Sequence, residues 1–192
     1  MIPVLLLACA PNVAPVTLEA VIQVESAGNP LALHVNGARV QPPPARDARE
    51  AAQVATSVIR RGYSVDLGLM QVNSRNLAAL GMTVEQVLDP CANVRAGATI
   101  LTADYAAAVR SRGPGEAALQ AALSAYNTGD FQRGFANGYV ARFYGRFAIP
   151  TVGHVVAVGT AAAKRAPPAP PPSPYTADST VFAREMNNVR ID

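Results

Sequence analysis

The chain has 192 residues, half of them apolar, which suits one domain with a real core and a short appendage. Its net charge of +3 rests on fifteen arginines and a single lysine, and it contains no basic run of the kind found in nucleic-acid-binding proteins. Composition and charge therefore favour a compact, alanine-rich helical domain and exclude the usual signature of a nucleic-acid partner.

The chain begins with MIPVLLLACAP, whose apolar run predicts a short core helix. This start has no positive flank and is too short for a normal signal peptide, so any export signal is expected to be missing from this chain. The segment Leu6-Leu7-Ala8-Cys9 also imitates a lipoprotein cleavage site. We expect no stable membrane insertion, because the apolar segment near Val152–Ala163 is short and contains His154.

The first regular elements predicted are a helix and a β-hairpin. Val13–Ala27 has apolar residues at helical spacing and is followed by Gly28, a common residue just after a helix. Asn36-Gly37 is the strongest short hairpin signal in the chain, and it lies between the apolar stretches Leu31–Val35 and Ala38–Val40. We therefore expect a small hairpin directly after the first long helix.

The rest of the first 150 residues predicts further helices with recognisable start signals. Asp47 with Glu50 forms an Asp variant of the capping box, and Thr83 with Gln86 forms a second box. Asp89-Pro90 opens a long helix. The predicted helices are Ala48 to Gly62, Ser74–Leu80, Val84–Leu88, one from Pro90 with Val94, Ala98, Leu101 and Tyr105 inward, Glu116–Asn127, and an aromatic one with Val140, Phe143 and Phe147.

Composition divides the chain into three parts. Residues 1–150 are predicted to form one mainly α-helical domain with a small β-hairpin, and residues 151–165 are a terminal segment of uncertain structure. Residues 166–192 begin with a proline-dominated stretch, which predicts an extended linker, and end in a polar tail that is expected to be flexible.

Cys9 and Cys91 are the only cysteines, and their spacing excludes a CxxC redox motif. Together with His34 and His154 they make a poor zinc site, so we expect no metal and no cofactor. The residues alone leave two interpretations open: two buried thiols, or a disulfide between the N-terminal segment and a later helix. A disulfide would imply an oxidising compartment.

Glu25 is the most informative residue, because it lies on the apolar face of its predicted helix. It follows Leu18, Val21 and Ile22 at helical spacing. Burial of a carboxyl raises its pKa, and a carboxyl that stays protonated near neutral pH is what general acid catalysis requires. A structural alternative is a buried Glu satisfied by hydrogen bonds or by an arginine such as Arg95.

Two further segments of the sequence support a functional interpretation of Glu25. Gly68-Leu69-Met70-Gln71 is a glycine-led loop of uncharged groups suited to lining a sugar cleft, and Ala125-Tyr126-Asn127 ends a helix. In this order with Glu25-Ser26, the three motifs resemble those of lytic transglycosylases of the lysozyme-like superfamily. More narrowly, CAPNVAP at Cys9–Pro15 and LDPCANVRAGATIL at Leu88–Leu101 are similar to transglycosylases encoded with type IV secretion systems.

The resemblance covers roughly residues 5 to 145 and implies a lysozyme-like fold and specific residue roles. It implies Glu25 as the catalytic acid and base, with Ser26 holding the carboxyl or the substrate. The other implied substrate-site residues are Met70 on the cleft floor, Gln71 and Asn127 as hydrogen-bonding partners of the sugars, and Tyr126 orienting Glu25. The family's two-cysteine pattern matches Cys9 and Cys91, which favours the disulfide.

The implied activity is cleavage of the bond between N-acetylmuramic acid and N-acetylglucosamine in peptidoglycan, with formation of 1,6-anhydro ends. The implied location is the periplasm, and the implied partners are peptidoglycan and other secretion components, met through the C-terminal tail. Two alternatives remain: a hydrolytic muramidase in which Asp66, otherwise a solvent-facing residue, positions water, and a peptidoglycan-binding structural component without catalysis. An intact Glu25 argues against the second.

Overall fold

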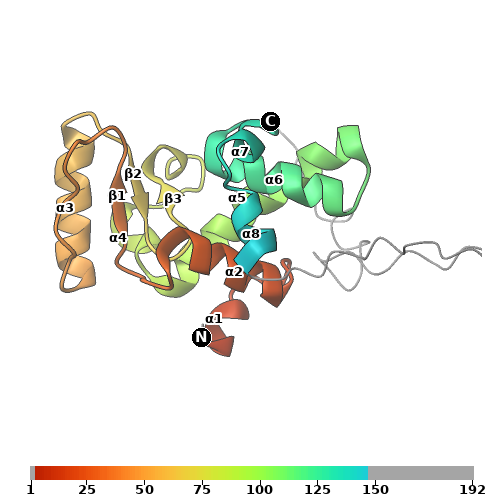
Figure 1. The fold of residues 1–192 in the computed structure, drawn as a ribbon. Coiled ribbons are helices and arrows are strands. Elements are labelled where there is room, and N and C mark those ends of the chain that lie inside the picture. Colours follow the sequence, from red (N-terminus) through yellow and green to blue (C-terminus); the bar gives the residue numbers. More distant parts are fainter. Residues whose placement is uncertain (1–2, 147–192) are drawn as a thin grey trace, which may run out of the picture.

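The computed structural model describes residues 3–146, which form a helical body with a small sheet at one end (Figure 1). The sheet and α3 lie at one end of the molecule, and the long helices lie at the other. The elements are α1 (Val4–Leu7), α2 (Pro15–Ser26), β1 (Leu33–Val35), α3 (Ala48–Arg60), β2 (Val65–Leu67), β3 (Val72–Asn73), the 3₁₀ helix η1 (Ser74–Asn76), α4 (Val84–Val87), α5 (Pro90–Arg112), α6 (Glu116–Thr128), α7 (Arg133–Ala136) and α8 (Ala141–Arg146).

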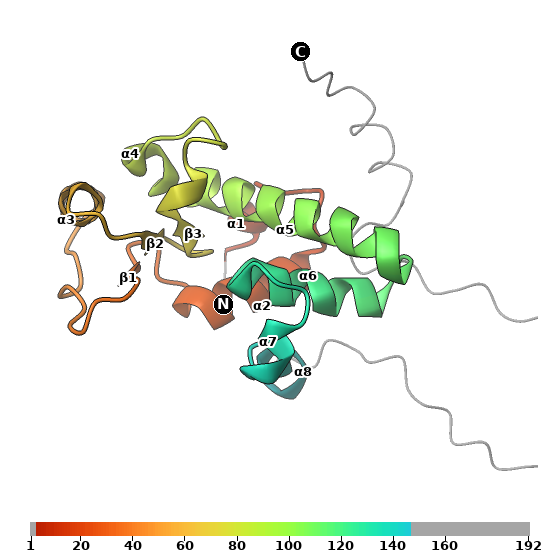
Figure 2. The ribbon, with the colours of Figure 1, turned by 90° about the horizontal axis from the view of Figure 1, so that it is seen from above.

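The core is built around α5 and α6, which pack side by side (Figure 2). The predicted inward stripe of α5 is confirmed, since Val94, Ala98, Leu101 and Tyr105 are all buried. Leucine and alanine side chains of α6, Leu119, Ala122 and Leu123 among them, fill the space against it. Alternation of large and small side chains lets the two helix backbones approach closely, which makes α5 and α6 the rigid frame of the domain.

Three helix starts follow the predicted capping signals. Asp89 accepts a hydrogen bond from the backbone N–H of Ala92 (2.8 Å) at the start of α5, and Thr83 with Gln86 forms a reciprocal capping box on α4. Asp47 caps α3, but Glu50 accepts from the backbone N–H of Arg46 instead of that of Asp47, so only half of this predicted box is present. The predicted helix from Ser74 to Leu80 is shorter than expected, with the 3₁₀ helix η1 followed by turns.

The sheet has three antiparallel strands in the order β1-β2-β3, with Val35 opposite Val65 and Leu67 opposite Val72. The hairpin predicted around Asn36-Gly37 is therefore wrong: β1 pairs with β2, and the hairpin of this fold is β2–β3. The side chain of Gln41 explains the difference. Its amide donates to the carbonyl of Val35 (3.0 Å) and accepts from the N–H of Val35 (2.7 Å), so it takes the place of a partner strand on that edge.

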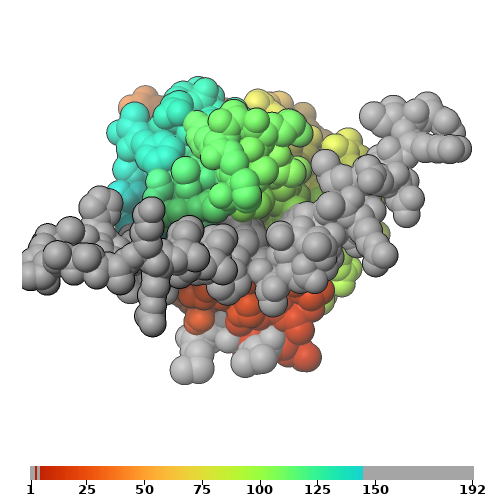
Figure 3. Space-filling view, turned by 90° about the vertical axis from the view of Figure 1, so that its right-hand side faces the viewer, coloured from red at the N-terminus to blue at the C-terminus, as the bar shows by residue number. Residues whose placement is uncertain are grey.

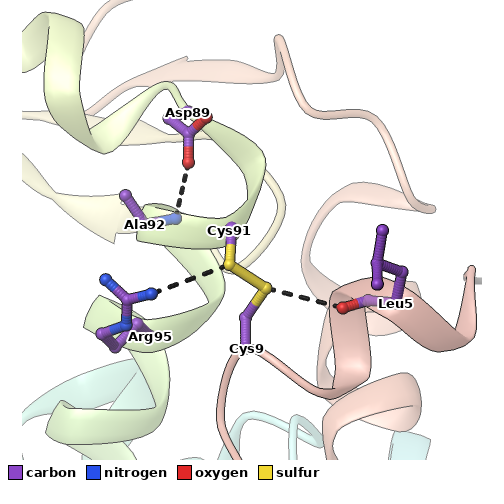
Figure 4. Close-up of a disulfide and its surroundings, with 6 residues drawn as sticks. All are labelled: Leu5, Cys9, Asp89, Cys91, Ala92 and Arg95. Carbon is purple, nitrogen blue, oxygen red and sulfur yellow. Dashed lines mark hydrogen bonds between the residues drawn. A yellow bond between two sulfur atoms is a disulfide. The ribbon is translucent and has the colours of Figure 1, made fainter.

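A disulfide joins Cys9 to Cys91, with 5.4 Å between their Cα atoms (Figure 4). It fixes the segment after α1 to the first turn of α5. The disulfide interpretation is thus confirmed, and neither free buried thiols nor a lipid on Cys9 is compatible with it. The predicted core helix at the N-terminus is confirmed as one short helix, but its Leu5 is 83% exposed, so it lies on the surface of the core.

The predicted aromatic helix corresponds to α8, which begins just after Val140 and contains Phe143, and the short helix α7 precedes it. Val140 and Phe143 are buried, whereas Phe147, the segment 151–165 and the predicted linker and tail lie outside the described residues. Figure 3 views the end of the molecule at the α5–α6 connection, with the C-terminal helices on one side and the N-terminal segment below. Within residues 3–146, none of the helices has the length and apolar character needed to cross a membrane.

Candidate active site

A cleft of about 970 Å³ separates the sheet from the long helices. Both parts of the molecule contribute to its walls, and most of its polar side chains come from the sheet and from helix ends. The lining includes Glu25 from α2, His34 and Asn36 at β1, Asp66 from β2, Gln71, Asn73 and Arg75 around β3, Ile100 and Asp104 from α5, Tyr126, Asn127 and Thr128 from α6, and Tyr139 and Arg142 at α8. Its amide, hydroxyl and charged side chains can hydrogen-bond a polar ligand.

Glu25 lies in the last turn of α2, on the wall of the cleft. The residues that place it there, Leu18, Val21 and Ile22, are fully buried as their spacing predicts. Burial is the main reason that the pKa of Glu25 rises from 4.5 to about 7. The negative charge of Asp66 acts in the same direction. The carboxyl therefore exists in both protonation states near neutral pH, as an acid that must also act as a base requires.

Tyr139 is the side chain that holds Glu25. Its hydroxyl donates a hydrogen bond to Oε1 of Glu25, and this bond works against the rise of the pKa by favouring the carboxylate. Tyr139 is only 2% exposed and packs edge-on against Phe143, which fixes the direction of its hydroxyl. Arg142 lies over the same ring, 5.8 Å from its centroid, and its charge also favours the carboxylate.

The family resemblance implied that Tyr126 orients Glu25, but in the structure Tyr126 has another partner. Its hydroxyl donates to the backbone carbonyl of Met70 (2.6 Å). Tyr126 thus supports the loop of the cleft, and the orientation of Glu25 falls to Tyr139. Sequence reasoning missed Tyr139 because the only signal was its place beside Val140 in a predicted aromatic helix, which indicates core packing as well as it indicates a site.

Ser26 does not fill the first of its two expected roles, which was to hold the Glu25 carboxyl, and contact with substrate stays a prediction. Its hydroxyl donates to the carbonyl of Leu69 (2.7 Å) and to that of Ile22 (3.1 Å), so it does not hold the Glu25 carboxyl. The bond to Leu69 fastens the end of α2 to the loop between β2 and β3. Ser26 therefore acts on the site by joining the two segments that form its floor.

The loop Gly68–Gln71 is held in an unusual backbone conformation. Gly68 has φ +73° and Gln71 has φ +47°, both in the left-handed region. A Cβ on Gly68 would lie 2.4 Å from the amide nitrogen of Asn93, so only glycine fits. Met70 is fully buried and lies beneath the cleft instead of on its floor, whereas Gln71 lines the cleft and donates to the carbonyls of Gly68 (2.9 Å) and Ala32 (3.2 Å).

Asn93 is a buried residue that sequence reasoning did not single out. Its amide group donates to the carbonyls of Leu67 and Val87 (both 2.8 Å) and accepts from the N–H of Met70 (2.8 Å). One side chain thus joins α5 to β2, to α4 and to the loop of the cleft. Its polar character on an otherwise apolar helix face was the available signal.

Asn127 and Asp66 both line the cleft. Asn127 is exposed at the end of α6, and its Oδ1 accepts from Asn137 (3.0 Å). Asp66 does not simply face solvent: it is half-buried, and its two carboxylate oxygens accept from the amides of Asn36 (2.9 Å) and Asn73 (2.6 Å). The asparagines fix the carboxylate in one orientation.

Asp104 adds a further carboxyl to the α5 wall of the cleft. It forms no hydrogen bond or ion pair with any other residue of the described chain, and partial burial raises its pKa from 3.8 to about 6. Within residues 3–146, no group of three or more His, Cys, Asp or Glu side chains is arranged to hold a metal ion.

Comparison with known proteins places this chain in a protein family. Residues 5–145 match the transglycosylase SLT domain. Protein virB1 of Agrobacterium fabrum (strain C58) is 44% identical over 134 residues, which are 69% of this chain and 53% of that protein. Type IV secretion system protein virB1 of Brucella abortus is 45% identical over 139 residues, which are 70% of this chain and 58% of that protein. The chain thus spans little more than half the length of these curated relatives, and no solved structure matches it significantly.

Proposed function

The chain belongs to the transglycosylase SLT domain family, and from this premise we propose that it is a lytic transglycosylase that cleaves peptidoglycan with Glu25 as its single acid and base. The observation that carries the proposal is the half-buried Glu25 carboxyl on the cleft wall, whose pKa is raised to about 7 and which Tyr139 holds in place. Ser26, Tyr126 and Asn93 support the loop opposite it.

The reaction begins with protonated Glu25. Its proton passes to the glycosidic oxygen between N-acetylmuramic acid and N-acetylglucosamine, and the bond from that oxygen to C1 breaks. The N-acetyl group of the muramic acid stabilises the electron-poor C1. Glu25, now a carboxylate, takes the proton of the O6 hydroxyl as O6 bonds to C1. The product is a 1,6-anhydro sugar, the proton returns to Glu25, and no water is consumed.

The nearby groups favour this cycle of protonation. Burial favours the neutral acid before the reaction, and the Tyr139 hydroxyl and the charge of Arg142 stabilise the carboxylate that forms during it. Gln71 and Asn127 are proposed to hydrogen-bond hydroxyl or N-acetyl groups of the sugars, because both line the cleft. Gln71 would do so through Oε1 and Asn127 through Nδ2, since the other polar atom of each amide is bonded within the protein. Met70 contributes from beneath the cleft, through the backbone that Tyr126 and Asn93 hold.

A second candidate function is hydrolysis, and the fixed orientation of Asp66 favours it. Hydrolysing glycosidases use two carboxylates, and the carboxylate of Asp66 is held by two amides in the same cleft as Glu25. In that reaction a water activated by Asp66 would attack C1 in place of O6. Mass spectrometry of products formed in ¹⁸O-labelled water separates the two: transglycosylation gives an unlabelled anhydro sugar, and hydrolysis gives a labelled reducing end.

The Glu25→Gln variant tests catalysis itself. The amide keeps the shape and still accepts from Tyr139, but it has no proton to give, so the rate of muropeptide release should fall by roughly two to four orders of magnitude. Circular dichroism and thermal unfolding establish that the variant is folded. A folded Glu25→Gln protein that releases muropeptides at the parent rate would show that Glu25 is not the catalyst, and retained binding without any parent activity would favour a structural peptidoglycan-binding component.

The setting proposed for this activity is the cell wall of a bacterium with a type IV secretion system. The support is the similarity to the virB1 proteins, one of which is named for that system. Local opening of the glycan network would make room for assembly of the apparatus, and the enzyme would work in the periplasm, where the Cys9–Cys91 disulfide is stable. Other components of the system are proposed to meet the C-terminal tail.

A further inference from the structure

A second cavity of about 840 Å³ lies beside the cleft, between α3 and the chain that follows β1. In Figure 2, α3 is seen end-on, and the segment between β1 and α3 forms a loop beside it. Apolar walls come from side chains such as Val40, Val54 and Val58, while Arg39 and Arg61 supply charge. Tyr63 belongs to the lining of this groove and to that of the cleft, so the two cavities share a wall.

The charge of this groove has one sign. Its lining contains Arg39 and Arg61 and no Asp or Glu. No carboxylate of the described residues forms an ion pair with either guanidinium, since the ion pair found in this part of the chain is Arg46–Glu50. Arg61 lies over the ring of Tyr63, 5.9 Å from its centroid, which holds one guanidinium at the side of the groove that adjoins the cleft.

We propose that this groove binds the acidic stem peptide that is attached to the glycan strand in the cleft. The inference rests on the proposed function, which places peptidoglycan in the cleft. Each muramic acid of that polymer carries a short peptide with free carboxylates on its lactyl group, and an extended peptide of about four residues reaches roughly 13 Å from its attachment point. Such a peptide passes over Tyr63 into the groove, where Arg39 and Arg61 bind its carboxylates and the valines contact its small apolar side chains.

Charge complementarity selects this occupant over the glycan itself. The sugars of the strand are neutral, so they gain nothing from two arginines, whereas a guanidinium binds a carboxylate by paired, charge-assisted hydrogen bonds. The backbone edge next to the groove is not open for strand addition, because Gln41 already occupies the N–H and carbonyl of Val35. The side chains of the groove are therefore what a ligand meets.

The test measures binding without turnover in the Glu25→Gln background. The probes are a tetrasaccharide with stem peptides whose carboxylates are free and the same molecule with those carboxylates amidated, titrated by calorimetry. We expect the free form to bind about tenfold more tightly, and Arg39→Gln/Arg61→Gln to reduce its affinity to that of the amidated form. Arg60→Gln is the matched control, because Arg60 is a neighbour on α3 that does not line this groove, and it should keep the preference.

Three results would overturn the inference. Equal binding of the two probes by the parent background would show that the stem carboxylates are not recognised. An equal loss of affinity in Arg60→Gln and in Arg39→Gln/Arg61→Gln would show a general effect of surface charge. Weaker binding of both probes in Arg39→Gln/Arg61→Gln would show that the arginines contact the glycan. Failure of both probes to bind at all would instead contradict the proposed function, and the inference with it.

Discussion

Burial of Glu25 couples the chemistry of the site to the stability of the fold. The pKa of this carboxyl is about 7 in the folded protein and 4.5 for an ordinary Glu, so between these values the folded state binds more protons than the unfolded state. Stability is therefore lost as the pH rises from 4.5 to 7 and then stays at the lower level. A substitution that removes the charge of Glu25 should therefore abolish catalysis and at the same time increase stability.

We expect Glu25→Gln to be more stable than the parent at pH 8 and equally stable at pH 4. The difference in free energy of unfolding should grow through the interval from 4.5 to 7 and reach roughly 1–3 kcal/mol, because a one-unit pKa shift corresponds to about 1.4 kcal/mol and the group is only partly shielded from water. Denaturant unfolding of both proteins across this pH range measures it. Parallel stability curves would mean that Glu25 is not desolvated.

Tyr139 and Tyr126 provide a matched pair of variants for the alkaline limb of the pH profile, where Glu25 loses its proton. Tyr139→Phe removes a hydrogen bond that lowers the pKa of Glu25, so that pKa should rise further and the loss of kcat/KM at alkaline pH should move to higher pH. Tyr126→Phe removes a bond to the Met70 carbonyl and should leave this limb in place. The pH profile of muropeptide release decides between them, and identical profiles for the two variants would contradict our assignment of Tyr139.

Individual residues were predictable to the extent that helical spacing determines them. Glu25 followed from its distance to Leu18, Val21 and Ile22 on one short helix, which is a local property of the sequence. The partner of Glu25 was not predictable in this way, because Tyr126 near the end of α6 and Tyr139 in the turn before α8 are both tyrosines far from Glu25 in the sequence. Only the packing of α8 against α2 decides which hydroxyl reaches the carboxyl.

At the level of whole elements, α5 and the cleft loop approach each other at Gly97. A Cβ at this position would lie 2.6 Å from Cβ and 2.7 Å from the sulfur of Met70, and 2.9 Å from the hydroxyl of Tyr126. Met70 cannot easily retreat, since its N–H is held by Asn93 and its carbonyl by Tyr126. Because Gly97 has no Cβ, α5 and the loop can approach each other this closely.

We expect Gly97→Ala to destabilise the protein by about 1–3 kcal/mol through overpacking, which outweighs the gain of at most about 1 kcal/mol from better helix propensity. Release of muropeptides should fall as well, because the loop carries Gln71 into the cleft. Thr99→Ala, at an exposed site on the same helix, serves as the control. A Gly97→Ala protein with higher stability and full activity would show that the loop adapts freely.

Helices were predicted better than strands for a physical reason. Capping signals such as Asp89-Pro90 and Thr83 with Gln86 act within one turn, so the local sequence contains all the information needed. The strands are only two or three residues long and pair with segments far along the chain. The Asn36-Gly37 signal was sound as a turn, with Gly37 at φ +78°, but the Gln41 side chain replaced the expected second strand.

For the whole molecule, truncation tests whether the catalytic domain and the C-terminal tail have separate functions. The family match ends at residue 145, and within residues 3–146 the side chains that line the cleft all precede that position. Deletion of residues 166–192 should therefore leave muropeptide release within about twofold of the parent, while transfer through the secretion system should fall if the tail meets other components. Loss of muropeptide release would place the tail in the enzyme domain, and no change in either assay would remove its proposed docking role.

Several of the side chains that join the segments around the cleft are uncharged amides and hydroxyls. Asn93 joins α5 to the loop and to α4, Ser26 joins α2 to the same loop, and Gln41 closes the edge of β1. Amides and hydroxyls of this kind neither gain nor lose protons across the range in which Glu25 titrates, and salt hardly screens their bonds. These three links therefore stay in place across the pH range in which the reactivity of Glu25 changes.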